Sequence, residues 1–494
     1  MHLARSPDKQ SLDLSSHYVV LGSGLNAIST IHGILDNCDD VNKKIFVIDA
    51  GIKNRIEINK SHFEVDPKLP SPKFKIGSNS YVYENFSRML NITSNGFHPI
   101  GSLAKGGLSN IWGGGIQPYN EKELLKYPYS YTAVKNIYSK IYEILTGSEI
   151  DYIDLEKGFG ERDNFSTRKP LLAIKDQNRG ENFCSIKSCA TGCIYCNRNI
   201  FNSSHELDRL LSHDKLEYKA GLFVESVDYL DSYYSINCIN ISTGKIFQFK
   251  ATTVYSCLGA LSTTKIALGM SKSTSLLPLL TTPGGVFFTF SFRKFTRRDN
   301  QIFASQAFLG KVGRERFDGA LHPVSENLLS VYLGENLGRL ANKLFGSFLL
   351  SRVFIANMFF SSDLSSSSML AIDNKVRINS AIHPNLKTIF LKAMKTVKKG
   401  LYSKGLWVLP FGKKILQPGQ DIHYGGLLPM KKYPTENECD FNGELWGFKN
   451  FYVADSSSMP FLASKGHSFN SMVNAYYISS KSIKRKSKKI NSPV

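Results

Sequence analysis

One short segment near the start of the chain constrains its fold more than any other. Residues 18–27 read YVVLGSGLNA, an apolar run followed by the pattern G-x-G-x-x-A. Gly22 permits a tight turn, Gly24 lets the backbone approach a pyrophosphate, and the small Ala27 lets a helix pack close to the strand. The N-terminus of that helix presents free N–H groups and the positive end of its dipole to an anion. The segment therefore predicts a strand, a turn and a helix that bind a dinucleotide.

A second apolar run supports this interpretation. Residues 45–48 read IFVI and are followed by Asp49. In dinucleotide-binding folds an acid about 20 residues beyond the glycines accepts hydrogen bonds from a ribose. Residues 17–51 are thus predicted to form a βαβ unit. The alternative is an ordinary strand-turn-helix with an incidental acid.

Composition and charge limit the class of protein. The chain has 494 residues, of which 42% are hydrophobic and 21% charged, and its formal net charge is +20. These proportions are typical of a globular protein of two or more domains. A basic chain binds nucleic acid, an anionic membrane surface or anionic substrates. We find no nucleic-acid-binding motif and predict no nucleic-acid partner. The basic residues at 481–489 predict a disordered, solvated tail over 483–494, or a segment attracted to an anionic membrane.

Targeting signals and cysteine usage indicate location. Residues 1–16 lack an apolar core of a signal peptide, and the longest apolar stretch, 345–360, is interrupted by Ser351, Arg352 and Asn357. Eight cysteines do not suggest a disulfide scaffold in a chain of this length. We predict a cytoplasmic protein. The amphipathic segment 337–348 either faces the core or makes peripheral contact with an anionic surface at the inner membrane face.

Further along the chain, a glycine-rich segment stands out. Residues 101–115 read GSLAKGGLSNIWGGG, with six glycines in fifteen residues. This density lets a backbone lie against a flat or charged ligand, whereas Leu108, Ile111 and Trp112 argue against a flexible linker. Residues 253–260 predict a second strand-turn-helix, and residues 283–331 a sheet in a substrate-covering domain. Helices are predicted at 131–145, 385–401 and from about 471, and strands across 216–249 and at 450–455.

A cluster of cysteines leaves several interpretations open. Its spacing is C-x4-C-x3-C-x2-C, formed by Cys184, Cys189, Cys193 and Cys196. Four thiols in so short a segment can ligate zinc or an iron–sulfur cluster, although the spacing matches neither the ferredoxin run nor a paired zinc knuckle. Reduced thiols or a local disulfide are the alternatives.

Four separated blocks resemble, in order, the glucose–methanol–choline (GMC) family of flavin oxidoreductases. They are the 22–27 turn with Asp49, residues 106–114, residues 256–261, and a C-terminal block from His423 to Asn470. The resemblance implies an α/β fold with a Rossmann-like FAD-binding domain and an α+β substrate-binding domain built on an antiparallel sheet. The FAD-binding domain would comprise residues 15–280 and 415–482, with a Cys-rich insertion near 184–196, and the substrate-binding domain residues 281–414. The chain departs from the family pattern at Asp49, where Glu is usual, at 425–430, and at Ser468, where Pro is typical.

The resemblance also implies a chemistry and a set of site residues. FAD would oxidise an alcohol to an aldehyde, ketone or lactone, which requires a base for the hydroxyl proton, and histidine suits that task. We expect His467 as the base and His423 as the hydroxyl partner, or the reverse, with Asn470 in reserve. Asp455 is expected near the ribityl chain or the pyrophosphate. The expected cofactor-binding residues are Gly22, Gly24, Ala27, Asp49, Gly106, Gly107, Ser109, Asn110, Gly113, Gly114, Gly259, Ala260, Asp455 and Ser468.

The substrate and the acceptor are less constrained. Family habit favours a small-molecule alcohol such as a sugar, polyol or glycan precursor, while oxygen, a quinone and a protein all remain open as electron acceptors. A flavin-binding member without turnover, serving as a structural or regulatory partner, is the alternative, because a fold does not guarantee its usual function.

Overall fold

The computed structural model describes most of the chain. The described residues are 10–53, 80–83, 85–151, 164–174, 200–293, 306–323, 348, 351–372 and 374–490. The cysteine cluster at 184–196 and the amphipathic segment 337–347 lie outside these residues.

A five-stranded parallel sheet forms the centre of the nucleotide-binding region. Its order is β21-β10-β2-β3-β6, and the strands are Phe451–Val453, Val254–Ser256, Tyr18–Leu21, Ile45–Ile48 and Leu216–Lys219. Every residue of β2, β3, β10 and β21 is buried, because helices and loops cover both faces, as is usual for parallel sheets. The apolar runs predicted as strands at 18–21 and 45–48 and within 253–260 and 450–455 are confirmed, the last two as the shorter β10 and β21. β21 comes from the last tenth of the chain, so this region is discontinuous in sequence.

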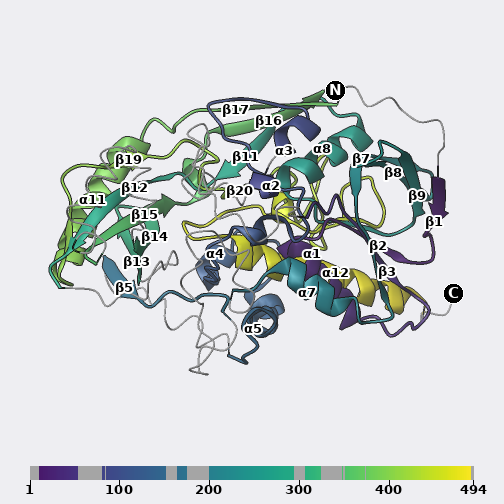
Figure 1. Cartoon of the computed structure of the whole chain (residues 1–494), viewed down its shortest axis with the longest axis horizontal. Coiled ribbons are helices and arrows are strands. Elements are labelled where there is room, and N and C mark those ends of the chain that lie inside the picture. Colours follow the sequence, from purple (N-terminus) through teal and green to yellow (C-terminus); the bar gives the residue numbers. More distant parts are fainter. Residues whose placement is uncertain are drawn as a thin grey trace.

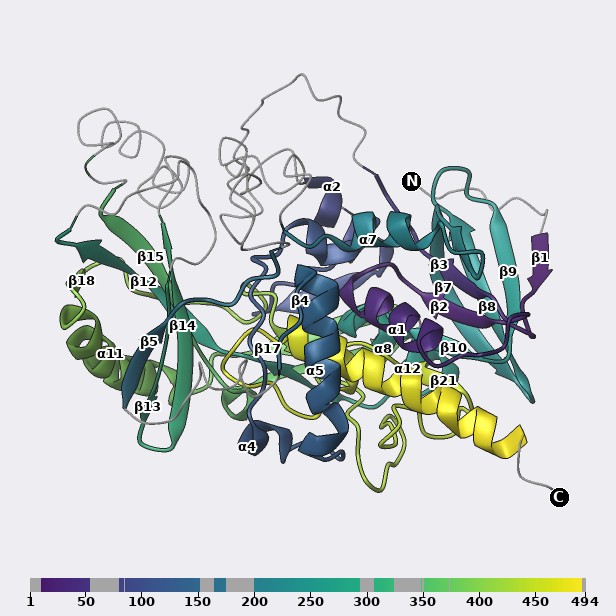
Figure 2. The same ribbon diagram turned by 90° about the horizontal axis from the view of Figure 1, so that it is seen from below.

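Helices α1 (Leu25–Leu35) and α12 (Ser468–Ile490) cross closely beside this sheet (Figures 1 and 2). The close approach requires a glycine, since a Cβ added to Gly33 would lie 3.0 Å from the carbonyl oxygen of Tyr476 and would contact Ser479 more closely still. Helices α5 (Tyr131–Thr146) and α7 (Ser203–Leu210) pack nearby. α8 (Ala260–Ser271) packs against β7 (Leu222–Leu230).

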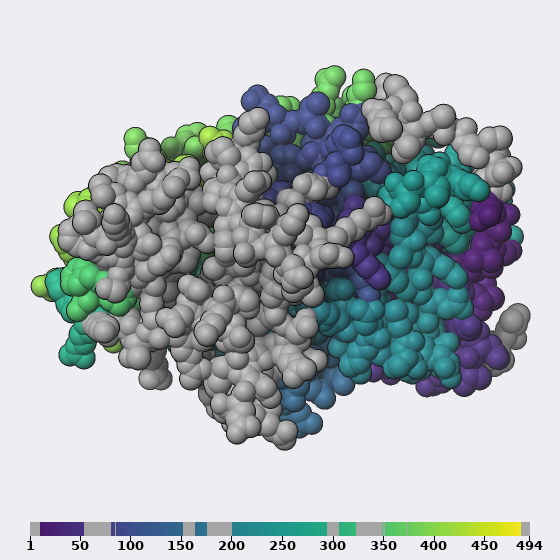
Figure 3. Space-filling view, in the orientation of Figure 1, coloured from purple at the N-terminus to yellow at the C-terminus, as the bar shows by residue number. Residues whose placement is uncertain are grey.

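A smaller sheet of order β1-β9-β8-β7 extends this end of the molecule. Its other strands are Gln10–Asp13, Ile246–Ala251 and Tyr233–Asn240. On the face drawn in Figure 3, residues 200–250 (teal) and the first strands (purple) lie together at one end.

Antiparallel strands dominate the other end of the molecule. A larger sheet has the order β18-β12-β15-β14-β13-β5, with β19 beside β12; its strands are Leu406–Val408, Gly284–Ser291, Val353–Phe360, Glu315–Pro323, Gln306–Val312, Phe165–Arg168 and Lys414–Ile415. One face packs on α11 (Leu386–Tyr402) through Phe308, Phe317 and Phe360. Because side chains alternate along a strand, Asp318, Asn357 and Phe359 point to the opposite face.

A five-stranded sheet joins the two ends. Its order is β20-β11-β16-β17-β4, and the strands are Tyr424–Gly425, Leu277–Thr281, Ser367–Ile372, Lys375–Ser380 and Ile92–Asn95. The remaining short helices are α2 (Ser80–Tyr83), α3 (Phe86–Met89), α4 (Glu121–Leu124), η3 (Gly107–Asn110), η6 (Ser362–Leu364) and η7 (Ser456–Ser458). The predicted domain boundary at 280/281 falls inside β11, and β4 and β5 come from the segment assigned to the first domain, so the division into domains stays a proposal.

The C-terminal segment differs from its prediction. Helix α12 begins at Ser468, three residues before the predicted start, and its backbone is helical to Ile490. The prediction of a disordered tail from residue 483 is therefore wrong over 483–490. The helices predicted at 131–145 and 385–401 are confirmed as α5 and α11. No helix among the described residues combines the length and the apolar character needed to cross a bilayer.

The crossing of α1 and α12 can be tested with Gly33→Ala. The added methyl meets Tyr476 and Ser479, so the variant should lose about 1–3 kcal/mol of unfolding free energy, measured by chemical denaturation. Gly269→Ala is the matched control, because no described residue comes within 4 Å of a Cβ at that exposed position of α8. There alanine should stabilise the helix by up to about 1 kcal/mol. Wild-type stability of Gly33→Ala would contradict the close crossing.

Candidate functional site

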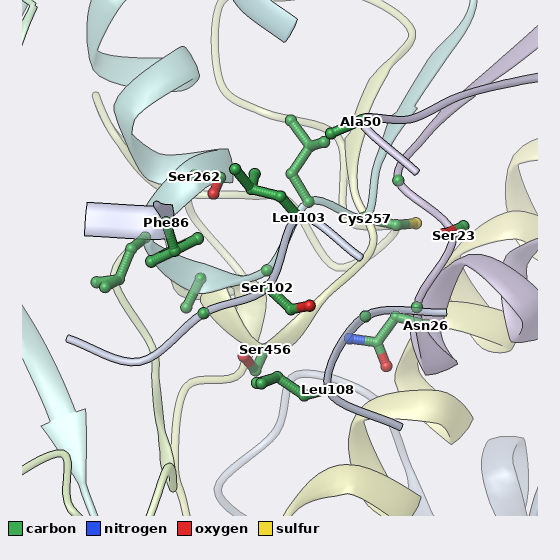
Figure 4. A pocket seen from close by; sticks show the side chains of 18 of the residues that line it. Ser23, Asn26, Ala50, Phe86, Ser102, Leu103, Leu108, Cys257, Ser262 and Ser456 are labelled. Carbon is green, nitrogen blue, oxygen red and sulfur yellow. The ribbon is translucent and has the colours of Figure 1, made fainter. Parts of the chain in front are cut away.

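A large cavity lies at the carboxyl ends of β2, β3 and β10, the edge where open α/β sheets bind ligands. It encloses about 1240 Å³, counting its opening to solvent. Figure 4 shows side chains from several separate segments around it, among them Ser23, Asn26, Leu103, Leu108, Cys257 and Ser456. Ser262, from the first turn of α8, and His467, immediately before α12, also line it.

Three helices begin at this cavity. Gly24 caps α1 and Gly259 caps α8, and as glycines neither offers a side chain to the N–H groups of its helix. Ser468, the first residue of α12, lines the same space. Helix N-termini carry unpaired N–H groups and partial positive charge, so their convergence favours a ligand with several negative charges.

Glycines open the space in front of these helices. No described residue comes within 4 Å of a Cβ built on Gly24 or on Gly259, so both face the open cavity. A Cβ on Gly107 would lie 3.3 Å from the Cα of Gly24, which shows that the two glycine segments face each other. Gly22 has φ +96° and a Cβ there would lie 2.6 Å from the carbonyl oxygen of Cys257. Only glycine fits that turn, as the sequence predicted.

Asp49 also lines the cavity and is held by a hydrogen-bond network. Ser23 Oγ donates to its carboxylate at 2.5 Å and Tyr218 OH donates at 3.0 Å, while the Gly106 N–H donates to Ser23 Oγ at 2.9 Å. Burial raises the pKa of Asp49 to about 6, although the bonds from Ser23 and Tyr218 act in the opposite direction. Sequence reasoning missed Ser23, which lies between the two glycines; a hydroxyl at that position was the available signal.

The 101–115 segment contributes to the cavity only in part. Gly107 and Ser109 line it, and Ser109 Oγ donates to the Gly106 carbonyl at 2.6 Å. The Asn110 amide donates to the carbonyls of Lys105 and Gly107 at 2.9 and 2.8 Å, so it shapes the loop.

The other predicted cofactor residues are not among those that line this cavity. Ala27 is fully buried within α1. Gly114 packs against Ala173 and Ile200, and Gly106, Gly113 and Asn110 do not line the cavity either.

Asp455 has a structural task in this site. Its buried carboxylate accepts hydrogen bonds from the Gly259 N–H at 2.9 Å, from Thr263 Oγ1 and from the Ser457 N–H at 2.9 Å. Burial raises its pKa. The side chain fixes the start of α8, where Gly259 and Ala260 line the cavity, and is not itself part of the lining.

The two predicted histidines lie together. The ring centroids of His423 and His467 are 5.5 Å apart and the rings are nearly perpendicular, at 87°. His467 is 8% exposed, and its Nδ1 has no hydrogen-bond partner among the described residues. Burial lowers the pKa of His467 to about 4, so the ring is neutral at physiological pH. The ring of His423 also contacts Phe359, with centroids 5.3 Å apart.

Asn470 is brought near the histidines but faces away from them. Its Oδ1 accepts bonds from the Tyr119 N–H at 2.8 Å and Tyr138 OH at 2.6 Å, and its Nδ2 donates to the Gln117 carbonyl at 2.9 Å. These bonds anchor the first turn of α12, which gives Asn470 a positioning role.

Asp421 is a site residue that sequence reasoning missed. Its side chain is 6% exposed, and its Oδ2 lies 3.5 Å from Nδ1 of His423. Thr282 Oγ1 donates to the same oxygen at 3.0 Å. Burial raises the pKa of Asp421 to about 7. The spacing Asp-x-His was the available signal.

The metal prediction finds no support within the part of the chain that the structure describes. There, no three His, Cys, Asp or Glu residues are grouped as a metal site. Cys184, Cys189, Cys193 and Cys196 lie outside the described residues, so zinc or an iron–sulfur cluster stays a prediction. The described cysteines, Cys38, Cys238, Cys257 and Cys439, are free thiols.

Comparison with known proteins identifies the fold. No family model and no curated protein sequence matches the chain. Among solved structures, pyridoxine 4-oxidase from Mesorbium loti is 12% identical with a TM-score of 0.60, covering 94% of this chain and 99% of that one. Formate oxidase from Aspergillus oryzae RIB40, in a structure concerned with FAD modification, is 10% identical with a TM-score of 0.62, covering 96% and 99%. The predicted α/β fold, a Rossmann-like domain with a second domain on an antiparallel sheet, is therefore confirmed, and so at the level of the fold is the resemblance to GMC oxidoreductases.

The burial of Asp49 predicts a pH dependence of stability. Its folded pKa of about 6 exceeds the ordinary value of 3.8, so the folded state binds the proton more tightly. The resulting stabilisation is fully present below pH 4 and is lost as the pH rises through 6. From pH 5 to pH 8 the wild type should lose about 1.4 kcal/mol of unfolding free energy more than Asp49→Asn.

Chemical denaturation across this pH range measures the difference. Asp214→Asn, which alters an exposed carboxyl before β6, should keep the wild-type slope. Equal slopes for the wild type and Asp49→Asn would refute a raised pKa of the buried Asp49 carboxyl.

Proposed function

We propose that this chain is an FAD-dependent oxidoreductase of the GMC type that oxidises a CH–OH group. One observation carries the proposal: a single cavity combines three helix N-termini and an acid at the end of β3 with a buried neutral imidazole. The first set suits a dinucleotide, and a neutral imidazole suits the hydroxyl of an alcohol, either as acceptor of its proton or as its hydrogen-bond partner. A protein that only bound a nucleotide would not need the buried imidazole in the same cavity.

The residues fit FAD. Gly24, Gly107 and Gly259 leave room for a pyrophosphate in front of the helix starts, where the N–H groups of α1 and α8 would bind it. Asp49 would accept from ribose hydroxyls. When bound, the flavin would supply the redox chemistry by accepting a hydride from the alcohol carbon.

The protein's own contribution is proton handling and positioning. His423 and His467 would hold the substrate hydroxyl between them, one accepting its proton and the other hydrogen-bonding the oxygen. Asn470 and its bonds to residues 117–119 keep His467 at the start of α12. Burial keeps His467 neutral and excludes water from its ring.

We propose a hydroxylated substrate, with sugars and polyols as the first class to test. The support is the sheet face that carries Phe359, the residue in contact with His423. That face also carries Asp318, which pairs with Arg168 at 3.4 Å, and Asn357, whose amide lies 3.3 Å from Nε2 of His322. Such polar groups beside aromatic ones are typical of sites that orient small polar molecules.

The electron acceptor and the alternative function can be tested together. Both structural neighbours carry the name oxidase, which favours oxygen as the acceptor here. A flavin-binding protein without turnover is the competing proposal. Reduction of the flavin by an alcohol under anaerobic conditions, followed by reoxidation in air, supports the oxidase, whereas a yellow protein that no alcohol reduces supports the alternative.

We further propose a cytoplasmic protein that makes peripheral contact with an anionic membrane. The free thiols of the described cysteines support the first part. For the second, residues 385–420 contain eight lysines and no Asp or Glu. Five of these lysines are exposed on α11, namely Lys387, Lys392, Lys395, Lys398 and Lys399. The exposed basic face of such a helix suits a layer of acidic headgroups, while its apolar face packs on the sheet.

His467→Ala tests the catalytic proposal. The variant should keep its flavin, because the glycines and Asp49 remain, but should lose at least about 100-fold in the rate of anaerobic flavin bleaching by the best alcohol of a sugar and polyol screen. His213→Ala, at an exposed site before β6, serves as the control and should bleach normally. A wild-type rate of flavin bleaching in His467→Ala would refute the catalytic role of His467.

Vesicle flotation tests the membrane proposal. The protein should float with vesicles rich in phosphatidylglycerol and stay behind with neutral vesicles. A triple charge reversal at Lys392, Lys395 and Lys399 should reduce flotation at least about 10-fold, since each lysine near such a surface contributes about 1 kcal/mol. Reversal of the exposed Lys122, Lys135 and Lys245 makes the same charge change elsewhere and should reduce flotation less. Equal losses in the two variants would refute contact through α11.

A further inference from the structure

The tripeptide Asp421-Ile422-His423 is a feature that the proposed function does not explain. It precedes β20 and places a buried carboxyl against one of the two site histidines. Ile422 itself lines the cavity. Burial of a carboxyl group destabilises the folded protein unless its surroundings compensate, so this pairing requires an explanation.

Asp421 is held in place from two sides. Thr282, at the end of β11, donates from Oγ1 to Oδ2 at 3.0 Å, and the backbone N–H of His423 donates to Oδ1 at 3.3 Å. The Thr282 N–H also donates to the His423 carbonyl at 3.2 Å, which ties the two segments together. These bonds fix the carboxyl beside the imidazole, with Oδ2 at 3.5 Å from Nδ1.

The backbone between the two residues is strained. Ile422 has φ +64°, a region that β-branched residues rarely adopt. Such conformations persist only where the surroundings fix them, and they gather at functional sites. Here Ile422, in the left-handed conformation, turns the chain between the Asp421 carboxyl and the His423 ring.

Few titratable groups lie near Asp421 among the described residues. Its titratable neighbours on the same segment are His423 and Tyr424, and His467 lies beyond His423. The neutral Thr282 follows β11 directly, and His98 contacts the backbone of Pro418 and Gly419. Among the described residues, no lysine or arginine forms an ion pair with Asp421, and burial raises its pKa to about 7.

We propose that Asp421 is a positioning residue that fixes the tautomer of His423 and thereby makes His423 the base of the histidine pair. In this structure Oδ2 and Nδ1 form an ion-pair contact without a hydrogen bond between them. A small approach of the two groups lets the carboxylate accept the Nδ1 proton, which leaves the lone pair on Nε2. That atom lies beside the residue that precedes His467, since a Cβ on Gly466 would lie 3.9 Å from it, and the two histidine rings are 5.5 Å apart. The inference rests on the proposed function and assigns roles within its site.

The chemistry follows from the proton inventory. When the substrate O–H bond breaks, its proton forms the Nε2–H bond, and the alcohol carbon loses a hydride to the oxidised flavin of the proposed function. The resulting imidazolium is stabilised by the Asp421 carboxylate. If Asp421 is protonated instead, it donates to Nδ1, and Nε2–H becomes a donor that cannot accept the substrate proton. His467, a weak base because of its burial, fits the hydrogen-bonding role.

Asp421→Asn tests this role with two measurements. In protein labelled with ¹⁵N-histidine, the His423 signal, assigned by its loss in His423→Gln, should show the Nδ1–H tautomer at pH 8.5 and change as the pH falls through Asp421's titration. Asp421→Asn should remove that change. Anaerobic flavin reduction should slow about 100-fold in this variant and lose its dependence on the same titration. Asp363→Asn, an exposed carboxyl on η6, should match the wild type in both.

The outcomes separate this inference from the proposed function. If no alcohol reduces the wild-type flavin, the proposed function fails, and the NMR measurement still decides the tautomer. If the wild type is reduced and Asp421→Asn keeps its rate, its pH profile and the tautomer of His423, the role of Asp421 is overturned while the function stands.

A second variant covers a failure of Asp421→Asn to fold. Thr282→Val keeps the carboxyl and removes one hydrogen bond to its charged form, so the pH midpoint of flavin reduction should move upward. An unchanged midpoint would overturn the proposal.

Discussion

The structure depends on close contact between backbones at the carboxyl edge of the parallel sheet. The turn after β2 lies against the carbonyl of Cys257, and the loop at Gly107 faces Gly24. Side chains at Gly22, Gly24 or Gly107 would fill or close this space. Because the backbone is bare here, three helix starts can face one cavity and direct their N–H groups at the same ligand.

Burial then sets the protonation state of the groups around that cavity. It raises the pKa values of Asp49 and Asp421 to about 6 and 7 and lowers that of His467 to about 4, so each shift favours the neutral form. Desolvation is the first cause in all three cases. A site of this kind interacts strongly with any charge placed in it, whether the charge belongs to a ligand or forms when a proton moves.

The sequence predicted the central part of the fold well and parts of the site less well. Buried parallel strands are short apolar runs followed by small residues, which is why β2, β3, β10 and β21 could be found. Gly22, Gly24, Asp49, Gly259 and His467 line the cavity and were singled out from sequence because such residues have a fixed place in the motif. Ser23 and Asp421 were missed because their importance arises from partners far away, Gly106 and Thr282, which no local pattern reveals. The helical backbone of 483–490 was missed because charge suggested solvation, whereas α12 continues from a helix whose earlier turns pack on α1.

The sequence by itself determined the dinucleotide-binding unit, since glycine spacing and apolar runs act over a few residues and hardly depend on the rest of the chain. Only the tertiary structure decided which polar side chains face the cavity. Asn110, Asp455 and Asn470 carry suitable groups, but they form hydrogen bonds with backbone atoms and neighbouring side chains of the loops and helices around the site. It also placed Asp421 against His423, because a strained residue and a hydrogen bond from Thr282 fix that contact. Where a side chain points and which groups it bonds to depend on how the whole chain packs, so neither can be inferred from composition or from the spacing of residues.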